Sequence, residues 1–254
     1  MNSRVGGDAV QPGIGRWLVP LVVGLVGVGV GAGGMTMLGG SGRAQKQRIE
    51  AIVHDYLLEH PEILPQAMDR LRGKQSAAMV KESGDALEKP YAGGWLGAAD
   101  GDVVLVEFTD YNCGYCRASL PVVERLIAED PKLKVVFREY PILSEESVTA
   151  ARVALAAAAQ GKYAAFHGAL FAAGAVTPET IAAAQATAGL DAAAVQVAVQ
   201  SPQVAAELEA NHDFAKKLEF TGTPSWVVGD QILQGAVGYE ALKKAIADAR
   251  GARG

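Results

Sequence analysis

The segment VVLVEF, residues 103–108, most constrains the fold because it is an almost unbroken apolar run. Such a run is typical of a β-strand that is covered on both faces. The two cysteines of the chain, Cys113 and Cys116, follow it directly. The next segment, RASLPVVERLIAED, has the pattern of a helix. We therefore expect an α/β protein in which a buried strand leads into a cysteine-bearing helix.

Further strands and helices are predicted along the rest of the chain. KLKVVFREY, residues 132–140, is the next expected strand, and the alanine-rich residues 144–220 are expected to be helical because they contain several capping positions. SWVVG and QIL flank Gly229 and Asp230, a dipeptide typical of a two-residue hairpin. A final amphipathic helix is expected over Tyr239–Arg250. The predicted order is βαβ, a helical block, and then ββα.

The composition excludes several classes of protein. A chain of 254 residues that is 50% hydrophobic can bury a sizeable core. The net charge of −5 comes with scattered lysines and arginines and no basic stripe, so nucleic acid is not an expected partner. Two cysteines are too few for a disulfide scaffold. The four histidines show no ligand spacing; we expect each at the surface or at a helix cap, and we expect neither a metal site nor a cofactor.

The N-terminal region differs in kind from the rest. A polar stretch, residues 1–16, precedes the uncharged residues 17–38, which are long enough to cross a hydrocarbon core of about 30 Å. Two interpretations stay open: an uncleaved membrane anchor, or a secretory signal that is cut near Gly40–Gly42. Both predict a chain that is exported or membrane-bound.

A helical leader is predicted over residues 44–75. Its apolar residues recur at helical spacing, and Pro61 suits the first position of a second helix, which Pro65 is expected to restart or kink. These apolar stripes need a partner, which is either the chain's own main domain or other copies of the leader. Residues 76–102 are glycine-rich in their second half and are expected to form a linker and turn.

The spacing of the cysteines favours redox chemistry. At the start of a helix, unpaired N–H groups and the helix dipole stabilise a Cys113 thiolate, and Cys116 lies one turn on, where it can resolve a mixed disulfide. A structural disulfide would close too small a ring to stabilise the fold much. A metal-binding dithiolate is the other alternative, although no further cysteine is present to complete a zinc site.

Two acidic residues near the cysteines and a second motif are further candidates for the site. Glu107 lies inside the apolar strand, where it either shuttles protons to and from Cys116 or reaches solvent at the strand end. Asp110 is expected to act as a turn or cap residue. TGTPSWVVG, residues 221–229, predicts a tight turn before a strand, and a cis bond between Thr223 and Pro224 would suit it.

The segments VEFTDYNCGYC, FREYPIL and TGTPSWVVGDQILQGAVGYEALKKAI together resemble the DsbA-like thiol–disulfide oxidoreductases of the bacterial periplasm. The likeness covers roughly residues 46–250 and is greatest to the branch that contains ScsC and the Com1-type antigens. It implies a thioredoxin-like fold with an inserted helical domain. The domain boundaries that we expect are a polar N-terminus at 1–16, a transmembrane anchor or signal segment at 17–38, a helical leader at 44–75, a linker and turn at 76–102, two parts of a thioredoxin-like domain at 103–143 and 221–250, and an inserted helical domain at 144–220.

The resemblance also implies roles for particular residues. Cys113 would attack a substrate disulfide, Cys116 would resolve the product, and Glu107 matches the buried acid of the family. Pro224 would be cis and lie against the cysteines, with the backbone of Thr223 offered to an extended substrate. The dipeptide between the cysteines, which includes Tyr115 as an expected substrate contact, matches the isomerase DsbC rather than DsbA.

These features predict a periplasmic thiol–disulfide oxidoreductase that acts mainly as an isomerase or reductase on protein disulfides. Alternatives are a DsbA-like net oxidase and a copper(I)-binding protein that uses the same thiolates. The resemblance further implies a membrane redox partner, either a DsbD-like reductase or a DsbB-like oxidase, and a homotrimer formed through residues 46–75. Residues 44–254 are expected to face the periplasm, tethered to the inner membrane by residues 17–38.

Overall fold

The computed structural model of the protein describes residues 42–253. The chain divides into two units, one that ends at Ala67 and one that begins at Met68. The predicted anchor or signal at 17–38 lies outside the described residues. Between residues 42 and 253, none of the helices is both long and apolar enough to span a membrane.

The leader is helical, as the apolar spacing predicts, but its boundaries differ from the expectation. A first helix covers residues 42–59, a turn contains Pro61, and α2 runs from Ile63 to Ser83. Pro65 therefore lies in the first turn of α2, where its missing N–H has no intrahelical partner to lose. The expected linker at 76–102 is wrong in part, because α2 extends to Ser83 and the 3₁₀ helix η1 and the strand β1 follow it.

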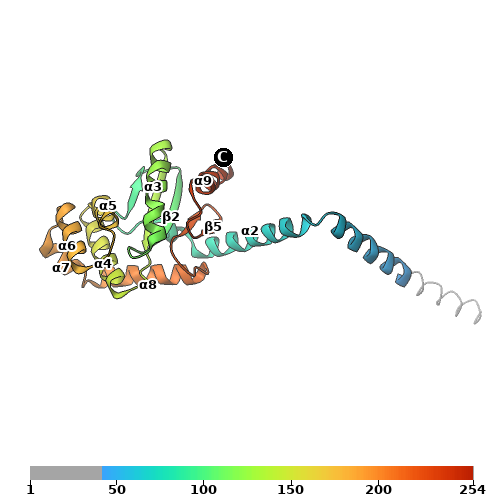
Figure 1. The fold of residues 1–254 in the computed structure, drawn as a ribbon, viewed down its shortest axis with the longest axis horizontal. Coiled ribbons are helices and arrows are strands. Elements are labelled where there is room, and N and C mark those ends of the chain that lie inside the picture. Colours follow the sequence, from blue (N-terminus) through green and yellow to red (C-terminus); the bar gives the residue numbers. More distant parts are fainter. Residues whose placement is uncertain (1–41, 254) are drawn as a thin grey trace, which may run out of the picture. The chain divides into compact units, whose positions relative to one another are not determined.

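A five-stranded sheet forms the centre of the second unit, in the order β1-β3-β2-β4-β5 (Figure 1). β2 and β3 are parallel, and the three remaining pairings are antiparallel. The predicted hairpin is confirmed: Val228 pairs with Gln231 across a two-residue turn in which Gly229 has a φ of 56°. The strands are β1 (Trp95–Gly97), β2 (Val103–Thr109), β3 (Leu133–Glu139), β4 (Ser225–Val228) and β5 (Gln231–Gln234).

Helices occupy the rest of the second unit. η1 covers Asp85–Glu88, and the longer helices are α3 (Gly114–Glu129), α4 (Glu145–Ala159), α5 (Tyr163–Ala173), α6 (Pro178–Thr187), α7 (Ala192–Ala198), α8 (Pro202–Lys217) and α9 (Tyr239–Arg253). Five of them, α4 to α8, lie between β3 and β4 in the sequence. Figure 1 shows α4 to α7 grouped beside the sheet and α3 in front of it.

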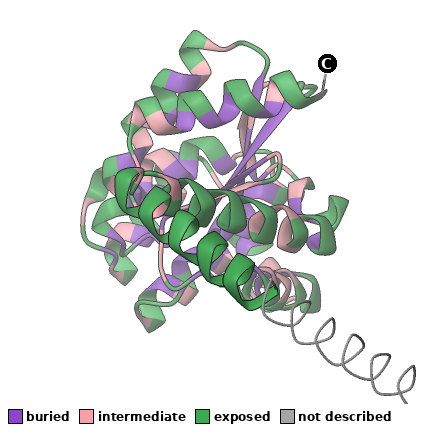
Figure 2. Cartoon of the chain, turned by 90° about the vertical axis from the view of Figure 1, so that its right-hand side faces the viewer, coloured by how far each residue is buried: buried purple, intermediate pink, exposed green. Residues whose placement is uncertain are grey.

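Both faces of the sheet are covered, as the apolar run at 103–108 predicts. Every residue of β2 is buried, and the strands stand out as the buried centre in Figure 2. On one face Val103 and Leu105 pack with α3, α9 and the helices that follow β3. On the other face Val104 and Val106 pack with η1 and the end of α8. This alternation points Glu107 toward the face covered by α3.

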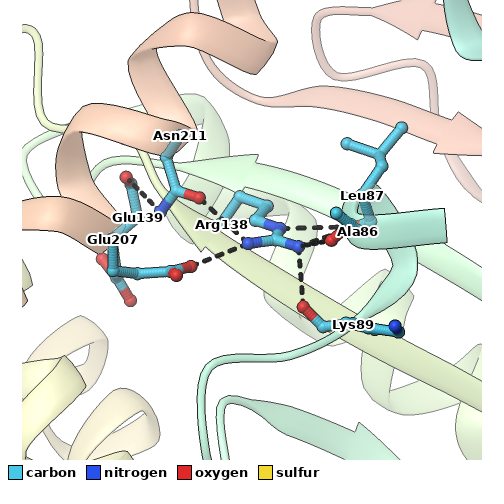
Figure 3. Close-up of polar contacts among 7 residues, drawn as sticks. All are labelled: Ala86, Leu87, Lys89, Arg138, Glu139, Glu207 and Asn211. Atoms are coloured by element: carbon cyan, nitrogen blue, oxygen red, sulfur yellow. Dashed lines mark hydrogen bonds and ion pairs between the residues drawn. The ribbon is translucent and has the colours of Figure 1, made fainter. Parts of the chain in front are cut away.

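A buried arginine ties β3 to elements that are distant in the sequence (Figure 3). Arg138 donates hydrogen bonds to the carboxylate of Glu207 at 2.7 Å and to the side chain of Asn211 at 3.2 Å, both on α8. It also donates to the backbone carbonyls of three residues at η1 and just beyond it: Ala86, Leu87 and Lys89. Because the guanidinium is only 3% exposed, the carboxylate and the carbonyls replace its lost hydration.

Candidate active site

The two cysteines lie where β2 passes into α3. Cys113 is the N-cap residue of α3, and Cys116 lies in the first turn of the helix. Both are free thiols and both are buried, with 6% and 1% of their surfaces exposed. The backbone N–H of Cys116 donates to the Cys113 sulfur at 3.4 Å. The leading sulfur therefore lies at the helix N-terminus, where the sequence predicts it.

Asp110 shapes the turn before the cysteines. Its Oδ1 accepts from the backbone N–H of Asn112 at 2.8 Å and from the Ser147 hydroxyl at 2.7 Å. Its Oδ2 accepts from the backbone N–H groups of Ile142 and Leu143 at 2.9 and 3.0 Å. The expectation of a turn residue is confirmed, and the same carboxylate also joins the cysteine loop to the loop after β3.

The two thiols differ strongly in acidity. The pKa of Cys113 is lowered to about 5, first because the Cys116 side chain donates a hydrogen bond to its sulfur. Burial opposes that shift, while the side chain of Thr223 and the backbone N–H groups of Cys116 and Tyr115 add to it. The pKa of Cys116 is raised, first by burial and then by its hydrogen bond to Cys113. At neutral pH the site thus holds one thiolate and one thiol, which is the division of roles that exchange needs.

Glu107 lies below the cysteines with 3% of its surface exposed, so the alternative that it reaches solvent is wrong. Burial raises the pKa of its carboxyl well above the usual range, and the negative charges of Glu139 and Cys113 raise it further. The charge of Glu107 in turn raises the pKa of Cys116. The carboxyl is therefore electrostatically coupled to both thiols.

The TGTPSWVVG segment, residues 221–229, lies against Cys113 in the folded chain. The Thr223–Pro224 peptide bond is cis, as the resemblance implies. The Cys113 sulfur lies 3.1 Å from the carbonyl oxygen of Thr223, to which it donates a hydrogen bond in its protonated form, although the two residues are 110 positions apart. Tyr115, between the cysteines, is 70% exposed. Of the six predicted site residues, the structure gathers all but Tyr115 into the buried part of the site.

A group of polar side chains beside the site escapes the sequence reasoning. Glu139, at the end of β3, accepts hydrogen bonds from Tyr163 at 2.8 Å and Tyr111 at 3.3 Å. The Tyr111 hydroxyl also contacts Nδ1 of His167 at 3.0 Å. The expectation that every histidine lies at the surface or at a cap is wrong for His167, which is 1% exposed. One feature of the sequence could have drawn attention to Glu139. It is a carboxylate near the end of the apolar strand KLKVVFREY, which follows the cysteine-bearing helix.

Among residues 42–253, no cluster of three or more histidine, cysteine or acidic side chains has the geometry of a metal site. A buried sheet strand, a thiolate at the N-terminus of the following helix and a cis-proline turn beside it define a thiol–disulfide redox centre of the thioredoxin type. The comparisons with known proteins agree with this class.

Residues 104–247 match the family described as the DSBA-like thioredoxin domain, and residues 45–78 match the N-terminal domain of the copper resistance protein ScsC. The chain belongs to the DsbA-like family of the thioredoxin superfamily and is of the ScsC type. The expected thioredoxin-like fold is thereby confirmed, and the protein is a thiol–disulfide oxidoreductase by family.

Several solved structures are similar to this chain. A thioredoxin-like oxidoreductase from Silicibacter pomeroyi is 42% identical, with 66% of this chain and 98% of that chain covered and a TM-score of 0.63. A periplasmic thioredoxin-like protein from Salmonella enterica is 29% identical, with 65% and 94% covered and a TM-score of 0.59. ScsC from Proteus mirabilis, in a transitional conformation, is 29% identical, with 82% and 96% covered and a TM-score of 0.62.

A curated relative is much longer than the part of it that matches this chain. It is a Na⁺/H⁺ antiporter NhaA 1 from Salinispora arenicola, 26% identical over 156 residues. The match includes 60% of this chain but only 24% of that protein's length.

Proposed function

We propose that this protein reduces and rearranges disulfide bonds of protein substrates in the periplasm, with Cys113 as the attacking residue. The observation that carries the proposal is the lowered pKa of Cys113 at the N-terminus of α3, next to the Thr223 carbonyl. Only the thiolate form of a cysteine is a nucleophile toward disulfides. At pH 7 a pKa of about 5 gives an excess of thiolate over thiol of about a hundredfold.

The first step is attack on the substrate. The Cys113 thiolate forms a bond to one substrate sulfur, the substrate S–S bond breaks, and the second substrate sulfur leaves as a thiolate that takes a proton from water. An extended substrate segment would bind along the backbone of Thr223, in the manner of an added strand. The exposed ring of Tyr115 provides an apolar contact beside the attacking sulfur.

The second step releases the substrate. Glu107 takes the proton of Cys116, and the resulting thiolate attacks the Cys113 sulfur. The substrate leaves as a thiolate, a Cys113–Cys116 disulfide remains, and two electrons have passed to the substrate. In the isomerase reaction another thiol of the substrate displaces Cys113 instead, and the protein stays reduced.

The direction toward reductase or isomerase is supported by the motif. Gly114 and Tyr115 separate the cysteines, so no histidine charge stabilises the Cys113 thiolate from within the motif. A pKa of about 5 lies between those typical of thioredoxin and of DsbA, about 7 and about 3.5. A protein whose attacking thiol has this intermediate pKa can remain a dithiol when a membrane reductase of the DsbD type supplies electrons.

Activity on scrambled ribonuclease tests the mechanism. The reduced protein should restore ribonuclease activity, Cys113→Ser should abolish this, and Cys116→Ser should accumulate a mixed disulfide with the substrate. Full activity of Cys113→Ser, or tight copper(I) binding without any exchange, would show that the proposal is wrong. The in vivo state of the pair decides the direction: mostly dithiol supports reduction or isomerisation, and mostly disulfide supports a net oxidase with a DsbB-like partner.

We also propose that residues 46–75 join three copies of the chain. Exposed apolar side chains recur along this segment, which is the feature expected of a helix that packs against other copies. They are Ile49, Ile52, Val53, Tyr56, Leu58, Leu64, Met68 and Leu71. Light scattering tests this: replacing Ile52 and Met68 by glutamate should reduce the mass to that of one chain. The same replacement at Leu143, an exposed apolar residue near the cysteines, should leave the mass unchanged.

The periplasmic location and the tether are proposed together. Redox exchange on substrate disulfides belongs to an oxidising compartment, and residues 17–38 have the length and hydrophobicity of a membrane-spanning segment. Fractionation of cells should recover the chain with the inner membrane, facing the periplasm. Recovery in the soluble periplasmic fraction, with a shortened N-terminus, would show that the segment is a cleaved signal instead.

A further inference from the structure

Glu139 is a second buried carboxyl on the face of the sheet that carries Glu107. Glu107 pairs with Phe137, and Thr109 pairs with Glu139, across the parallel strands β2 and β3. Glu139 thus lies two residues beyond the partner of Glu107 and points to the same face. It is fully buried. The redox site therefore rests on two neighbouring carboxyl groups, of which the mechanism above uses one.

The two carboxylate oxygens of Glu139 differ in their hydrogen bonds. The hydroxyls of Tyr163 and Tyr111 both donate to Oε1, whereas Oε2 has no partner among the described residues. Burial raises the pKa of Glu139 to about 8, and the two tyrosine hydrogen bonds oppose that shift. The negative charges of Asp110 and Glu207 raise the pKa further. Glu139 can therefore bind and release a proton close to neutral pH.

A chain of hydrogen-bonding groups joins Glu139 to the surface. The Tyr111 hydroxyl lies 3.3 Å from Oε1 of Glu139 and 3.0 Å from Nδ1 of His167. His167 lines a pocket of about 360 Å³ between α3, β1 and α5, together with Glu124. Burial lowers the pKa of His167 to about 3, so the ring is neutral, with one nitrogen that donates and one that accepts. Each member of the chain can receive one proton and pass one on.

We propose that Glu139 is a second proton-binding residue of the redox site, and that protons from solvent reach it through His167 and Tyr111. In one transfer, His167 takes a proton from the pocket at one ring nitrogen, the other nitrogen donates to the Tyr111 oxygen, and Tyr111 passes its own proton to Glu139. One proton moves from solvent to the carboxyl, and no electron moves. The proposal rests on the role of Glu107 in the proposed function.

The two carboxyls influence each other through charge. Ionised Glu139 raises the pKa of Glu107, because two like charges in a buried site repel. The Cys113 thiolate also raises the pKa of Glu107, and this charge disappears once Cys113 is part of a mixed disulfide. While Glu139 holds its proton, burial alone still raises the pKa of Glu107, which therefore ionises more readily and can accept the proton of Cys116. Glu139 acts through Glu107 and is a positioning residue for that transfer.

The pH dependence of the resolving step tests this coupling. In the unaltered protein, we expect the rate at which Cys116 releases a trapped substrate to rise with pH in two stages. Above about pH 8, Glu139 ionises and its charge raises the pKa of Glu107, so further ionisation of Glu107 is delayed to higher pH. Glu139→Gln should give one uninterrupted rise. The variant should match the unaltered protein below pH 7 and resolve faster above pH 8, by about tenfold for each unit by which the pKa of Glu107 falls.

Several outcomes separate the possible failures. Superimposable profiles, or a variant that is slower at every pH as a structural defect would make it, overturn this proposal while the proposed function stands. Absence of exchange in the unaltered protein overturns both. Carbon-13 NMR of the glutamate carboxyls in the unaltered, reduced protein is independent of any variant: it should show a buried carboxyl that titrates near pH 8, and its absence overturns the proposal.

The route is tested by a matched pair of variants. Tyr111→Phe and Tyr163→Phe each remove one hydroxyl that donates to Oε1 of Glu139. The rings of both tyrosines lie against His167, but of the two hydroxyls only that of Tyr111 is hydrogen-bonded to it. The infrared band of the Glu139 carboxyl, identified with Glu139→Gln, is followed after a pH jump. Tyr111→Phe should slow its relaxation by about tenfold or more, and Tyr163→Phe should leave it nearly unchanged. Equal slowing in both variants, or in neither, would rule out the route.

Discussion

The acidity of Cys113 should depend on the side chain at position 116. The largest cause of its lowered pKa is the hydrogen bond that the Cys116 thiol donates, and Cys116→Ala removes that donor while the backbone N–H groups remain. A hydrogen bond to a charged group contributes about 1.5–3 kcal/mol, and one pKa unit corresponds to about 1.4 kcal/mol. The pKa of Cys113 should therefore rise from about 5 by about one to two units.

Thiolate absorbance in the ultraviolet, titrated against pH, measures this shift. The chain has two cysteines, so the variant contains a single thiol and the signal belongs to Cys113 alone. The rate of alkylation at a pH below the midpoint provides a second reading of the same ionisation. Cys116→Ser is the control, because its hydroxyl keeps a donor in place and should leave the midpoint near 5. If the alanine variant titrates like the unaltered protein, or the serine variant shifts equally, the assigned hydrogen bond is wrong.

Three further predictions concern groups around the site. Glu107→Gln should slow the resolving step by about a hundredfold, since the proton of the resolving thiol loses its acceptor, and quenched-flow analysis of the mixed disulfide measures this. The pKa of Glu139 is raised in the folded protein, so its ionisation should lower the free energy of unfolding as pH rises from 4.5 to about 8, by on the order of 4 kcal/mol. Glu107 adds a decline of the same sign, so a urea titration series should show that Glu139→Gln makes the decline smaller by about that amount without removing it. Glu207→Ala leaves the buried Arg138 without its counter-charge and should destabilise the fold by about 3 kcal/mol in urea, whereas Asp248→Ala, in an exposed pair, should change little.

Local patterns in the sequence account for much of the architecture. Strand β2 and the hairpin around Gly229 were predictable because an unbroken apolar run and a Gly-Asp turn are set by side chains within a few residues of each other. The position of Cys113 at the start of α3 was predictable for the same reason. Strand β1 was missed because it has only three residues, ends in glycine and depends on β3 to complete its hydrogen bonds.

The sequence by itself determined where the reactive groups lie and favoured their chemistry: two thiols one helical turn apart, after a buried strand, are typical of a redox pair. Only the tertiary structure decided what surrounds them. The Thr223 carbonyl reaches Cys113 from 110 residues away, and the contacts of Glu139 with Tyr111 and Tyr163 join three separate segments of the chain. Such contacts follow from how strands and helices stack, and the acidity of buried groups follows from the water that stacking excludes, which no local pattern records.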